Sequence, residues 1–406
     1  MMREVSARAG ELIELERRFA ARNYAPLPVV LVRGEGCFAW DVDGRRYLDG
    51  LSGYSALNQG HRHPRIVAAL VEQVQRLTLT SRAFHNDRMG AFLQRLSEVS
   101  GFRRALPMNT GVEAVETAVK AMRRWGYERR GVPQGLGEIV VADGNFHGRT
   151  LLAVSLSTDP SSYAGYGPYV PGIVKVPFGD ADALGRALGP RTAGVLLEPI
   201  QGEAGVILPP DGYLARVRAL CAEQGVALCL DEVQTGLGRT GAMFAWEHWG
   251  ARPDLLCVGK ALSGGLYPVS AVCADEVLDV FTPGTHGSTY GGNPVAAAVG
   301  IAALDVTRDE RLPDRAAALG ELALRRLRAG LAGAEPVQEV RGRGLMIAVQ
   351  YRSPVAARVA RALASEAAVL CKDTRGHTLR FMPPLVTPED VLLEALERMV
   401  PVLARG

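Results

Sequence analysis

Six short apolar runs in the middle of the chain constrain its fold more than any other feature. They occur at 138–142, 151–156, 193–197, 226–230, 254–258 and 269–273, and helical stretches such as 212–224 fall between several of them. Strands that alternate with helices in this way are typical of a mostly parallel sheet covered by helices. The sequence therefore predicts an α/β fold in which all six runs are strands.

The segments on either side of these runs divide the chain further. Residues 11–22, 64–77, 86–100, 294–306 and 314–331 have helical spacing, and 37–48 alternates around Asp43-Gly44, which predicts a hairpin. After residue 336 the order becomes strand (337–349), helix (355–368), strand (377–381) and helix (389–403). We therefore predict an N-terminal segment over 1–54, a large cofactor-binding domain over 55–300 and a small C-terminal α/β domain over 301–406.

Composition excludes several classes of partner. The 46 basic and 43 acidic residues leave a charge of +3, which favours neither nucleic acid nor an anionic membrane as partner. No apolar run is long enough to span a membrane, and the N-terminus lacks an apolar signal core.

The six cysteines form no C-x-x-C pair and are typical of reduced core residues, which predicts a cytoplasmic protein. His61-x-His63 has no third ligand nearby, so a loop is favoured there and no metal site is predicted.

Lys260 is the strongest candidate for a reacting group. Only four of the 46 basic residues are lysines, and this one follows the apolar run at 255–258, between Gly259 and Ala261. A desolvated lysine amine can be neutral near pH 7 and form an imine with a carbonyl, whereas an arginine cannot. A single lysine at a strand end more often extends to solvent, so the assignment depends on the residues that accompany it.

Two further groups accompany Lys260. Thr110 and Glu113 fit a capping box, which places the amides of Gly111 and Val112 at a helix N-terminus that can bind phosphate, although an ordinary capped helix explains this motif equally well. Asp231 ends a buried strand, where an aspartate can pair with a pyridinium nitrogen or simply cap a helix. Gly111 could bind a phosphate, Asp231 a ring nitrogen and Lys260 an aldehyde. Together these three anchors favour pyridoxal phosphate as the cofactor.

Six motifs carry a resemblance to the class III aminotransferases, and within that family to the ornithine aminotransferases. They are Asn109-Thr110-Gly111-Val112-Glu113-Ala114, Gly144-Asn145-Phe146-His147-Gly148-Arg149-Thr150, Glu198-Pro199-Ile200-Gln201-Gly202-Glu203-Ala204-Gly205, Asp231-Glu232-Val233-Gln234-Thr235-Gly236, Gly259-Lys260-Ala261-Leu262-Ser263-Gly264-Gly265 and His286-Gly287-Ser288-Thr289-Tyr290-Gly291-Gly292-Asn293-Pro294. The resemblance extends from about residue 17 to the end of the chain. It implies the type I fold of pyridoxal-phosphate enzymes and a homodimer with active sites at the subunit interface.

The resemblance also implies roles for individual residues around the cofactor. Lys260 resembles the lysine that forms the imine and carries the proton, and Asp231 resembles the pyridinium partner. The remaining cofactor positions are Gln234 near the ring hydroxyl, Phe146 stacked on the ring, and Gly111, Val112 and Thr289 around the phosphate, Thr289 coming from the partner subunit. His147 departs from the pattern, because ornithine enzymes often carry tryptophan there.

The substrate residues follow from the same resemblance. Arg380 resembles the arginine for the α-carboxylate of a dicarboxylic substrate, and Arg149 resembles the one for the distal carboxylate. Glu203 would pair with Arg380 and mask it while ornithine is bound. The other implied contacts are Tyr24 to the ornithine carboxylate, Tyr54, which favours a free α-amine, and Ser288.

The implied reaction is that of an ornithine δ-aminotransferase. L-ornithine and 2-oxoglutarate would give glutamate and glutamate 5-semialdehyde, which cyclises to pyrroline-5-carboxylate, a reaction of arginine metabolism and proline biosynthesis. Transamination of N-acetylornithine or another ω-amine is the first alternative. An aminomutase on the same fold would need no external oxo acid, and a non-catalytic regulator would bind the cofactor without turnover.

Overall fold

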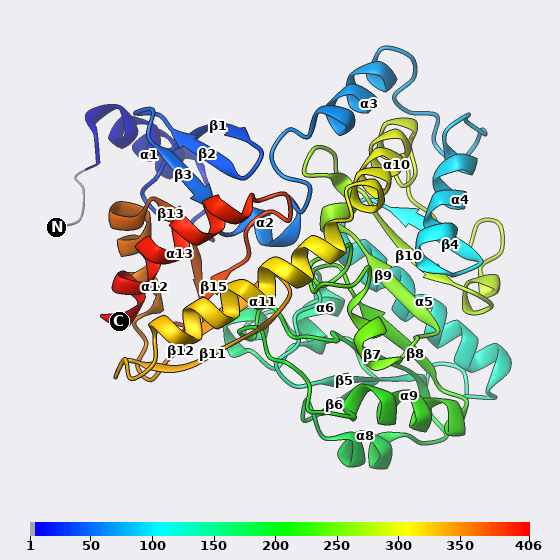
Figure 1. Ribbon diagram of the computed structural model, residues 1–406. Helices are drawn as coiled ribbons and strands as arrows, with labels where there is room; N and C mark the ends of the chain where they lie inside the picture. Colours follow the sequence, from blue (N-terminus) through cyan, green and yellow to red (C-terminus); the bar gives the residue numbers. More distant parts are fainter. Residues whose placement is uncertain (1–4) are drawn as a thin grey trace.

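The computed structural model describes residues 5–406, and a seven-stranded sheet forms the core of its larger part (Figure 1). The strand order is β4-β10-β9-β8-β7-β5-β6, with β10 antiparallel to both neighbours and the other pairs parallel. The strands are β4 (Arg104–Met108), β5 (Glu138–Ala142), β6 (Ile173–Val176), β7 (Thr192–Leu197), β8 (Ala227–Asp231), β9 (Leu255–Val258) and β10 (Ser270–Ala274). The predicted mostly parallel sheet is confirmed.

One of the six predicted strands is wrong. The run at 151–156 forms a helix, α6 (Leu151–Leu156), whose first turn is capped by Thr150: its Oγ1 accepts a hydrogen bond from the amide of Ala153 at 3.3 Å. A continuous apolar run fits a buried helix as well as a buried strand, so periodicity alone does not separate the two. Strands β4 and β6, which were not predicted, complete the sheet at its two edges.

Alternate residues of the central strands face opposite layers of helices. Val141 packs with the apolar face of α5 (Gly111–Arg129), while its neighbour Val140 packs with α8 (Ala181–Ala187) and α9 (Tyr213–Gln224). Because successive side chains of a strand point to opposite faces, burial on both sides requires apolar residues at every position. This explains why the strands appear in the sequence as unbroken apolar runs.

The predicted helices along the rest of the chain form with small shifts at their ends. They are α1 (Ala7–Phe19), α3 (Pro64–Val74), α4 (Met89–Ser100), α10 (Pro294–Asp309) and α11 (Leu312–Gly330), with short helices α2 (Ser52–Ser55) and α7 (Pro160–Tyr163) between them. Helix α1 begins before the predicted residue 11, because Ser6 accepts a hydrogen bond from the amide of Ala9 and caps it. None of the helices within residues 5–406 is long and apolar enough to cross a membrane.

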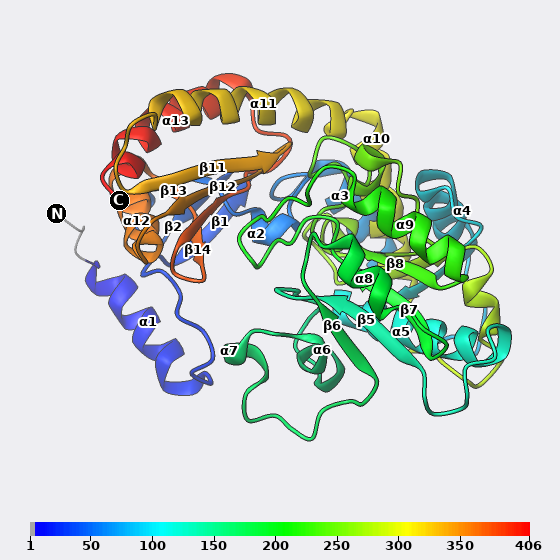
Figure 2. The same cartoon turned by 90° about the horizontal axis from the view of Figure 1, so that it is seen from below.

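The C-terminal part contains a second sheet, which is antiparallel. Its order is β11 (Val337–Arg343), β12 (Met346–Tyr351), β15 (Thr378–Phe381) and β14 (Lys372–Thr374). The single strand predicted over 337–349 is instead the hairpin β11–β12, which turns at Gly344 with a φ of 56° that favours glycine. Helices α11 and α13 (Glu389–Ala404) cover this sheet (Figure 2), and α12 (Ala356–Ala362) continues into a π-helical turn, Leu363–Ala367.

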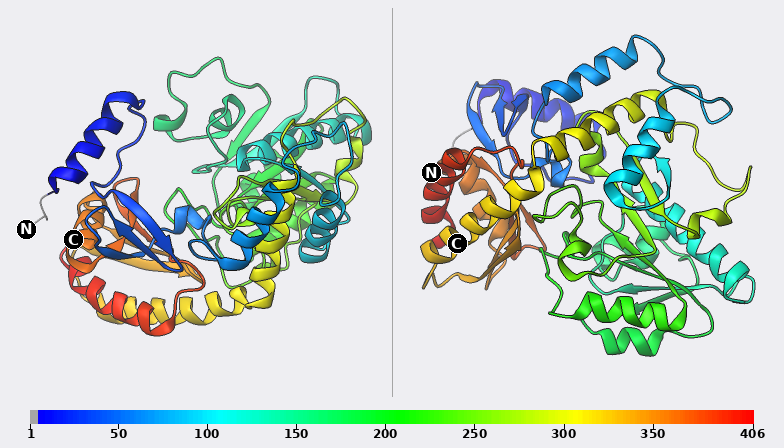
Figure 3. Two further views of the ribbon diagram at one scale, coloured as in Figure 1. Left: turned by 90° about the horizontal axis from the view of Figure 1, so that it is seen from above. Right: turned by 45° about the vertical axis from the view of Figure 1, so that its right-hand side comes forward.

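The N-terminal segment pairs with the C-terminal part. The predicted hairpin is confirmed as β2 (Phe38–Asp41) and β3 (Arg46–Asp49), and the third sheet has the order β1 (Leu31–Glu35), β2, β3, β13 (Val369–Leu370). Helices α1 and α13 accordingly lie at the same end of the molecule (Figure 3). The domain boundaries at residues 54 and 300 stay a prediction.

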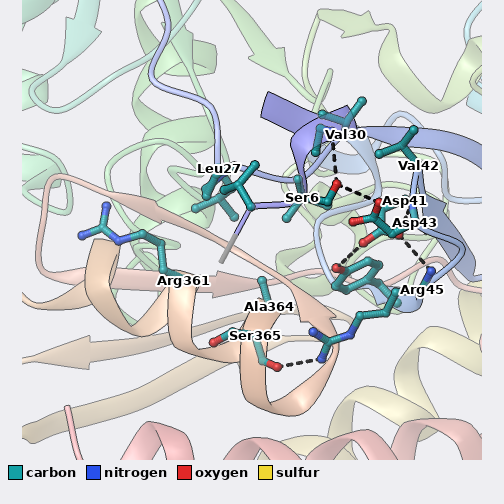
Figure 4. A pocket seen from close by; sticks show the side chains of 15 residues that line it. Ser6, Leu27, Val30, Asp41, Val42, Asp43, Arg45, Arg361, Ala364 and Ser365 are labelled. Carbon is teal, nitrogen blue, oxygen red and sulfur yellow. Dashed lines mark hydrogen bonds between the residues drawn. The ribbon is translucent and has the colours of Figure 1, made fainter. Parts of the chain in front are cut away.

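A small cavity separates helix α1 from this third sheet (Figure 4). Ser6 donates to Asp43 across it, with 2.8 Å between Oγ and Oδ1, and Arg45 donates to the carbonyl of Ser365 at 2.7 Å. These contacts fix the chain on either side of residues 20–30, the connection that carries Tyr24.

Arg239 joins segments that are distant in the sequence. Its fully buried guanidinium donates to the carbonyls of Leu345 (2.9 Å) and Pro383 (2.7 Å), to Ser52 Oγ (3.0 Å) and to Asn58 Oδ1 (2.5 Å). A buried guanidinium is costly where its donors are unpaired, and here both terminal nitrogens of Arg239 have acceptors. The network therefore holds the segment of α2, and with it Tyr54, against the second sheet.

Candidate active site

Three strands of the large sheet bring polar side chains to one edge. Asp231 is the last residue of β8, Glu198 follows β7, and Gly259-Lys260 follow β9. Because these strands are parallel neighbours, their carboxyl ends meet at the same edge, which is where open α/β sheets bind ligands. All of these side chains line one cavity of about 200 Å³, together with Gly111, Val112, Phe146, His147, Gly148, Ile200, Glu203, Val233, Gln234 and Thr235.

Lys260 enters this cavity from a strained backbone. Its φ is 42°, in the left-handed region that residues other than glycine seldom adopt, and it begins a short 3₁₀ helix, Lys260–Ser263. Burial lowers the pKa of Lys260, and three nearby carboxylates oppose this only in part. A lowered pKa increases the fraction of neutral amine, which is the nucleophilic form.

Asp231 is held by two hydrogen bonds. Its Oδ1 accepts from the amide of Val233 at 3.1 Å, and its Oδ2 lies 2.8 Å from Nδ1 of His147. Burial alone would lower the pKa of His147, but the hydrogen bond to Asp231 and its charge reverse this, so the pKa is raised. The hydrogen bond from His147 and the one from Val233 fix the orientation of the Asp231 carboxylate. His147, which departs from the expected sequence pattern, therefore has a definite partner.

Glu198 is a functional candidate that the sequence reasoning missed. Its two carboxyl oxygens accept hydrogen bonds from the amides of Phe146 (2.9 Å) and Gly202 (3.2 Å). Burial raises the pKa of Glu198 to about 7, with the charge of nearby His147 acting in the opposite direction. The signal was available, because Glu198 directly follows a buried strand beside the one that ends in Asp231.

The N-terminus of α5 forms one end of the cavity. The predicted capping box is confirmed, with Thr110 and Glu113 each bonded to the other's backbone amide. The amides of Gly111 and Val112 lie in the first turn, where backbone N–H groups have no acceptor within the helix and can bind an anion. A side chain at position 111 would place its Cβ 2.8 Å from Cγ1 of Val233. A larger residue there would require Val233 or the helix end to shift.

A second, larger cavity (the outer cavity) shares Glu203 with the first (the inner cavity). Its volume is about 1420 Å³, and Tyr24, Tyr54, Arg149, Glu203 and Arg380 all line it. Arg380 donates to Glu203 at 2.5 Å between Nη1 and Oε1, and Gln234 donates to the same oxygen at 3.2 Å. Burial acts to raise the pKa of Glu203, but the charge and hydrogen bond of Arg380, with smaller contributions from Gln234 and Lys260, together outweigh burial, and the pKa is lowered. Glu203 is therefore an anion, and it neutralises the guanidinium of Arg380 through this ion pair.

The two tyrosines and Arg149 surround this pair in different ways. Tyr54 has a φ of 58°, its ring lies 5.0 Å below the Arg380 guanidinium, and burial raises its pKa. Tyr24 is 86% exposed and extends into the cavity from the N-terminal connection. Arg149 donates to Ser162 Oγ at 3.1 Å and lies 5.2 Å from the ring centre of Phe146.

Two predicted site residues are not brought to either cavity of this chain. Ser288 Oγ accepts hydrogen bonds from the side chain of Asn109 and the amide of Gly291, both at 3.0 Å, and Thr289 is exposed. Neither lines the two cavities described above. Their predicted roles, that of Thr289 across a subunit interface, stay a prediction.

The donor set fits pyridoxal phosphate. Lys260 offers an amine of lowered pKa, Asp231 an oriented carboxylate, and the α5 N-terminus backbone amides beside a glycine that leaves room for an anion. Gln234 Oε1 and His147 Nε2 are buried without a hydrogen-bond partner. Within residues 5–406, no group of three or more His, Cys, Asp or Glu side chains is arranged to hold a metal ion.

Comparisons with known proteins agree with this geometry. The sequence pattern of the class-III aminotransferases matches residues 19–403. This chain belongs to the class-III aminotransferase family. An ornithine aminotransferase of Bordetella pertussis is 55% identical, over 97% of this aminotransferase and 95% of the relative.

Solved structures extend the comparison. An ornithine aminotransferase from Toxoplasma gondii superimposes with a TM-score of 0.95 at 43% identity, covering 97% of this aminotransferase and 94% of that chain. An acetylornithine aminotransferase from Elizabethkingia anophelis has a TM-score of 0.89, also at 43% identity, over 98% and 99% of the two chains. The predicted pyridoxal-phosphate fold, cofactor and class of enzyme are confirmed.

Substitution of Gly111 tests the anion site of this aminotransferase. We expect Gly111→Ala to weaken binding of pyridoxal phosphate to the apoenzyme by about tenfold, because accommodating the extra methyl must shift Val233 or the helix end. The double variant Gly111→Ala/Val233→Ala should recover most of this loss, with Val233→Ala alone as control. Titration of each apoenzyme, followed by cofactor absorbance, gives the dissociation constants. Equal affinity of Gly111→Ala and wild type would contradict the assignment.

Proposed function

We propose that this aminotransferase is an ornithine δ-aminotransferase. It would transfer the δ-amino group of L-ornithine to 2-oxoglutarate, giving glutamate 5-semialdehyde, which cyclises to pyrroline-5-carboxylate, and glutamate. The name of the Bordetella pertussis relative supports this substrate, at 55% identity over nearly the whole of both chains. The observation that carries the proposal is the Glu203–Arg380 ion pair at 2.5 Å in a cavity lined by Tyr24 and Tyr54.

The ion pair suits an enzyme that binds two unlike substrates in one cavity. A dicarboxylic oxo acid needs two cations, and Arg380 and Arg149 supply guanidinium groups that match carboxylates. Ornithine carries an ammonium at the reacting end, for which an unpaired arginine nearby is unfavourable. While Glu203 neutralises Arg380, the δ-amine can approach; when the oxo acid binds, its carboxylate replaces Glu203 at Arg380.

Residues of the inner cavity would perform the chemistry. Bound pyridoxal phosphate supplies an electron sink at the carbon that carries the reacting amine. The Lys260 amine, whose pKa burial lowers, would bind the cofactor aldehyde and move the proton at that carbon. Asp231, oriented by its hydrogen bonds with His147 and Val233, would pair with the ring nitrogen and keep it protonated. Phe146 would stack on the ring, Gln234 Oε1 would lie near the ring hydroxyl, and Gly111 and Val112 would hold the phosphate.

The proposal extends to assembly and location. A homodimer with active sites at the interface would bring Thr289 and Ser288 to the partner's site, which agrees with the exposure of Thr289 and the absence of both residues from this chain's two cavities. All six cysteines are free and buried, which suits a reducing cytoplasm. Residues 1–54, 55–300 and 301–406 would form the N-terminal segment, the large cofactor-binding domain and the small domain.

Transamination of N-acetylornithine is the second candidate. The acetylornithine aminotransferase of Elizabethkingia anophelis is as similar in sequence, at 43%, as the Toxoplasma gondii ornithine enzyme. The two substrates differ only at the α-nitrogen, which is a free ammonium in ornithine and an amide in N-acetylornithine. Tyr54 and Tyr24, at the outer end of the cavity, favour ornithine.

A comparison of amino donors tests the proposal. With 2-oxoglutarate as acceptor, we expect glutamate formation from L-ornithine with a kcat/KM at least tenfold above that for N-acetylornithine. Lys260→Ala, with an unchanged circular dichroism spectrum, should show no turnover without added amine. A higher kcat/KM for N-acetylornithine would show that the second candidate function is correct. Turnover without any oxo acid would indicate an aminomutase.

Tyr54 allows a separate test of donor selection. We expect Tyr54→Ile to raise the ratio of kcat/KM for 4-aminobutyrate to that for L-ornithine by about tenfold, because the ring under Arg380 is lost. Tyr54→Phe is the matched control: it keeps the ring and isolates the contribution of the hydroxyl. Steady-state kinetics with both donors measure the ratio, and an unchanged ratio in Tyr54→Ile would remove Tyr54 from the account.

A further inference from the structure

Lys372 is one of only four lysines in a chain with 46 basic residues, and the cofactor chemistry does not use it. It lies on β14, the edge strand of the second sheet, and its side chain is 29% exposed. In the register of the sheet, Lys372 is directly opposite Arg380. Directly opposite residues of antiparallel strands share a face, with Cβ atoms about 5 Å apart. Lys372 therefore faces the same cavity as Arg380, on its outer side.

The ammonium group of Lys372 fixes the segment that carries Tyr24. Its Nζ donates to the carbonyl oxygen of Ala25 at 3.0 Å, a hydrogen bond between residues 347 positions apart in the sequence. Ala25 directly follows Tyr24, and both line the outer cavity. Asp373 is 3.6 Å from the same ammonium, a loose contact. An ammonium has three donors, so Lys372 retains hydrogen-bonding capacity towards the cavity.

The other cations of the cavity have different surroundings. Arg380 is engaged by Glu203 at 2.5 Å, and Arg149 lies over Phe146 near the inner cavity. Arg375 lines the rim, is exposed, and makes a long hydrogen bond of 3.4 Å to the carbonyl of Gly144. Because Glu203 lines both cavities, a donor with its reacting amine at Lys260 and its remote end in the outer cavity would pass the Glu203–Arg380 pair. Lys372 is the cation beside that pair, on the side where Tyr24 lies.

We propose that Lys372 is a specificity-determining residue that selects amino donors with a carboxylate remote from the reacting amine. It holds Tyr24 in place through the carbonyl of Ala25 and adds a positive charge to the outer cavity while Glu203 neutralises Arg380. The inference rests on the proposed function, since it concerns how that site recognises ornithine. A lysine suits this position because its compact ammonium directs three donors to different acceptors, whereas a guanidinium fork is planar.

Three compounds that differ at the remote end test the proposal. L-ornithine carries the α-carboxylate, 5-aminopentanoate keeps the carboxylate without the α-amine, and putrescine lacks the carboxylate. In Lys372→Met we expect the KM for L-ornithine and the inhibition constant of 5-aminopentanoate against it to rise about tenfold. The kcat should stay within twofold of wild type, and the inhibition constant of putrescine should not rise. A change confined to ligands with a carboxylate distinguishes recognition from a general loss of structure.

Two control variants make the result specific. Lys372→Arg keeps the positive charge and should restore the KM for L-ornithine to within about threefold of wild type. Arg375→Met removes a cation from the rim of the same cavity and should leave all three constants within twofold of wild type. The double variant Lys372→Met/Tyr24→Phe should raise the KM for L-ornithine by less than the product of the two single fold-increases, because both residues act on one carboxylate.

The proposal is overturned if Lys372→Met leaves the constants for L-ornithine and 5-aminopentanoate unchanged. It is also overturned if Lys372→Met raises the inhibition constant of putrescine as much as that of 5-aminopentanoate, or if Arg375→Met has the same effect as Lys372→Met. Failure of the proposed function would be visible separately, as absent turnover of L-ornithine by the wild-type enzyme. The inhibition constants of 5-aminopentanoate and putrescine, measured against the donor that the wild type does accept, would still decide the role of Lys372.

Discussion

The burial of one lysine amine among carboxylates at the ends of three parallel strands is the constraint on which the site depends. Neighbouring strands β7, β8 and β9 deliver Glu198, Asp231 and Lys260 to one edge of the sheet. Burial lowers the pKa of Lys260 and raises the pKa of Glu198, and a hydrogen bond with His147 holds the Asp231 carboxylate in place. The pKa values of Lys260 and Glu198 at this edge of the sheet thus shift in opposite directions, because burial disfavours the charged form of both an amine and a carboxyl.

The second sheet supplies cationic side chains for substrate recognition. Arg380 on β15 and Lys372 on β14 face the outer cavity, and the Arg239 network and the Lys372–Ala25 hydrogen bond hold the tyrosine segments against this sheet. Cofactor chemistry and substrate recognition are therefore placed on different parts of the fold. This division agrees with family relatives whose names carry different substrates on one fold.

The residues that the sequence analysis assigned to the cofactor, except Thr289, line one cavity, and the signals that pointed to them are local. The capping box of Thr110 and Glu113, the strand that ends in Asp231 and the lysine after 255–258 are each contained in a few residues. The helix at 151–156 was mistaken for a strand because a short apolar run carries no periodicity. The Asp231–His147 and Lys372–Ala25 contacts join residues 84 and 347 positions apart, and no local pattern encodes such pairs. Even so, Glu198 could have been found by applying the strand-end rule to β7.

The masking of Arg380 by Glu203 is the central claim, and single-turnover kinetics test it most directly. Wild type and Glu203→Ala, loaded with pyridoxal phosphate and without oxo acid, would each be mixed with L-ornithine or L-glutamate while the absorbance of the bound cofactor is followed. If Glu203 masks Arg380, its removal should raise the rate with glutamate relative to ornithine at least tenfold. An unchanged ratio of the two rates would contradict the account.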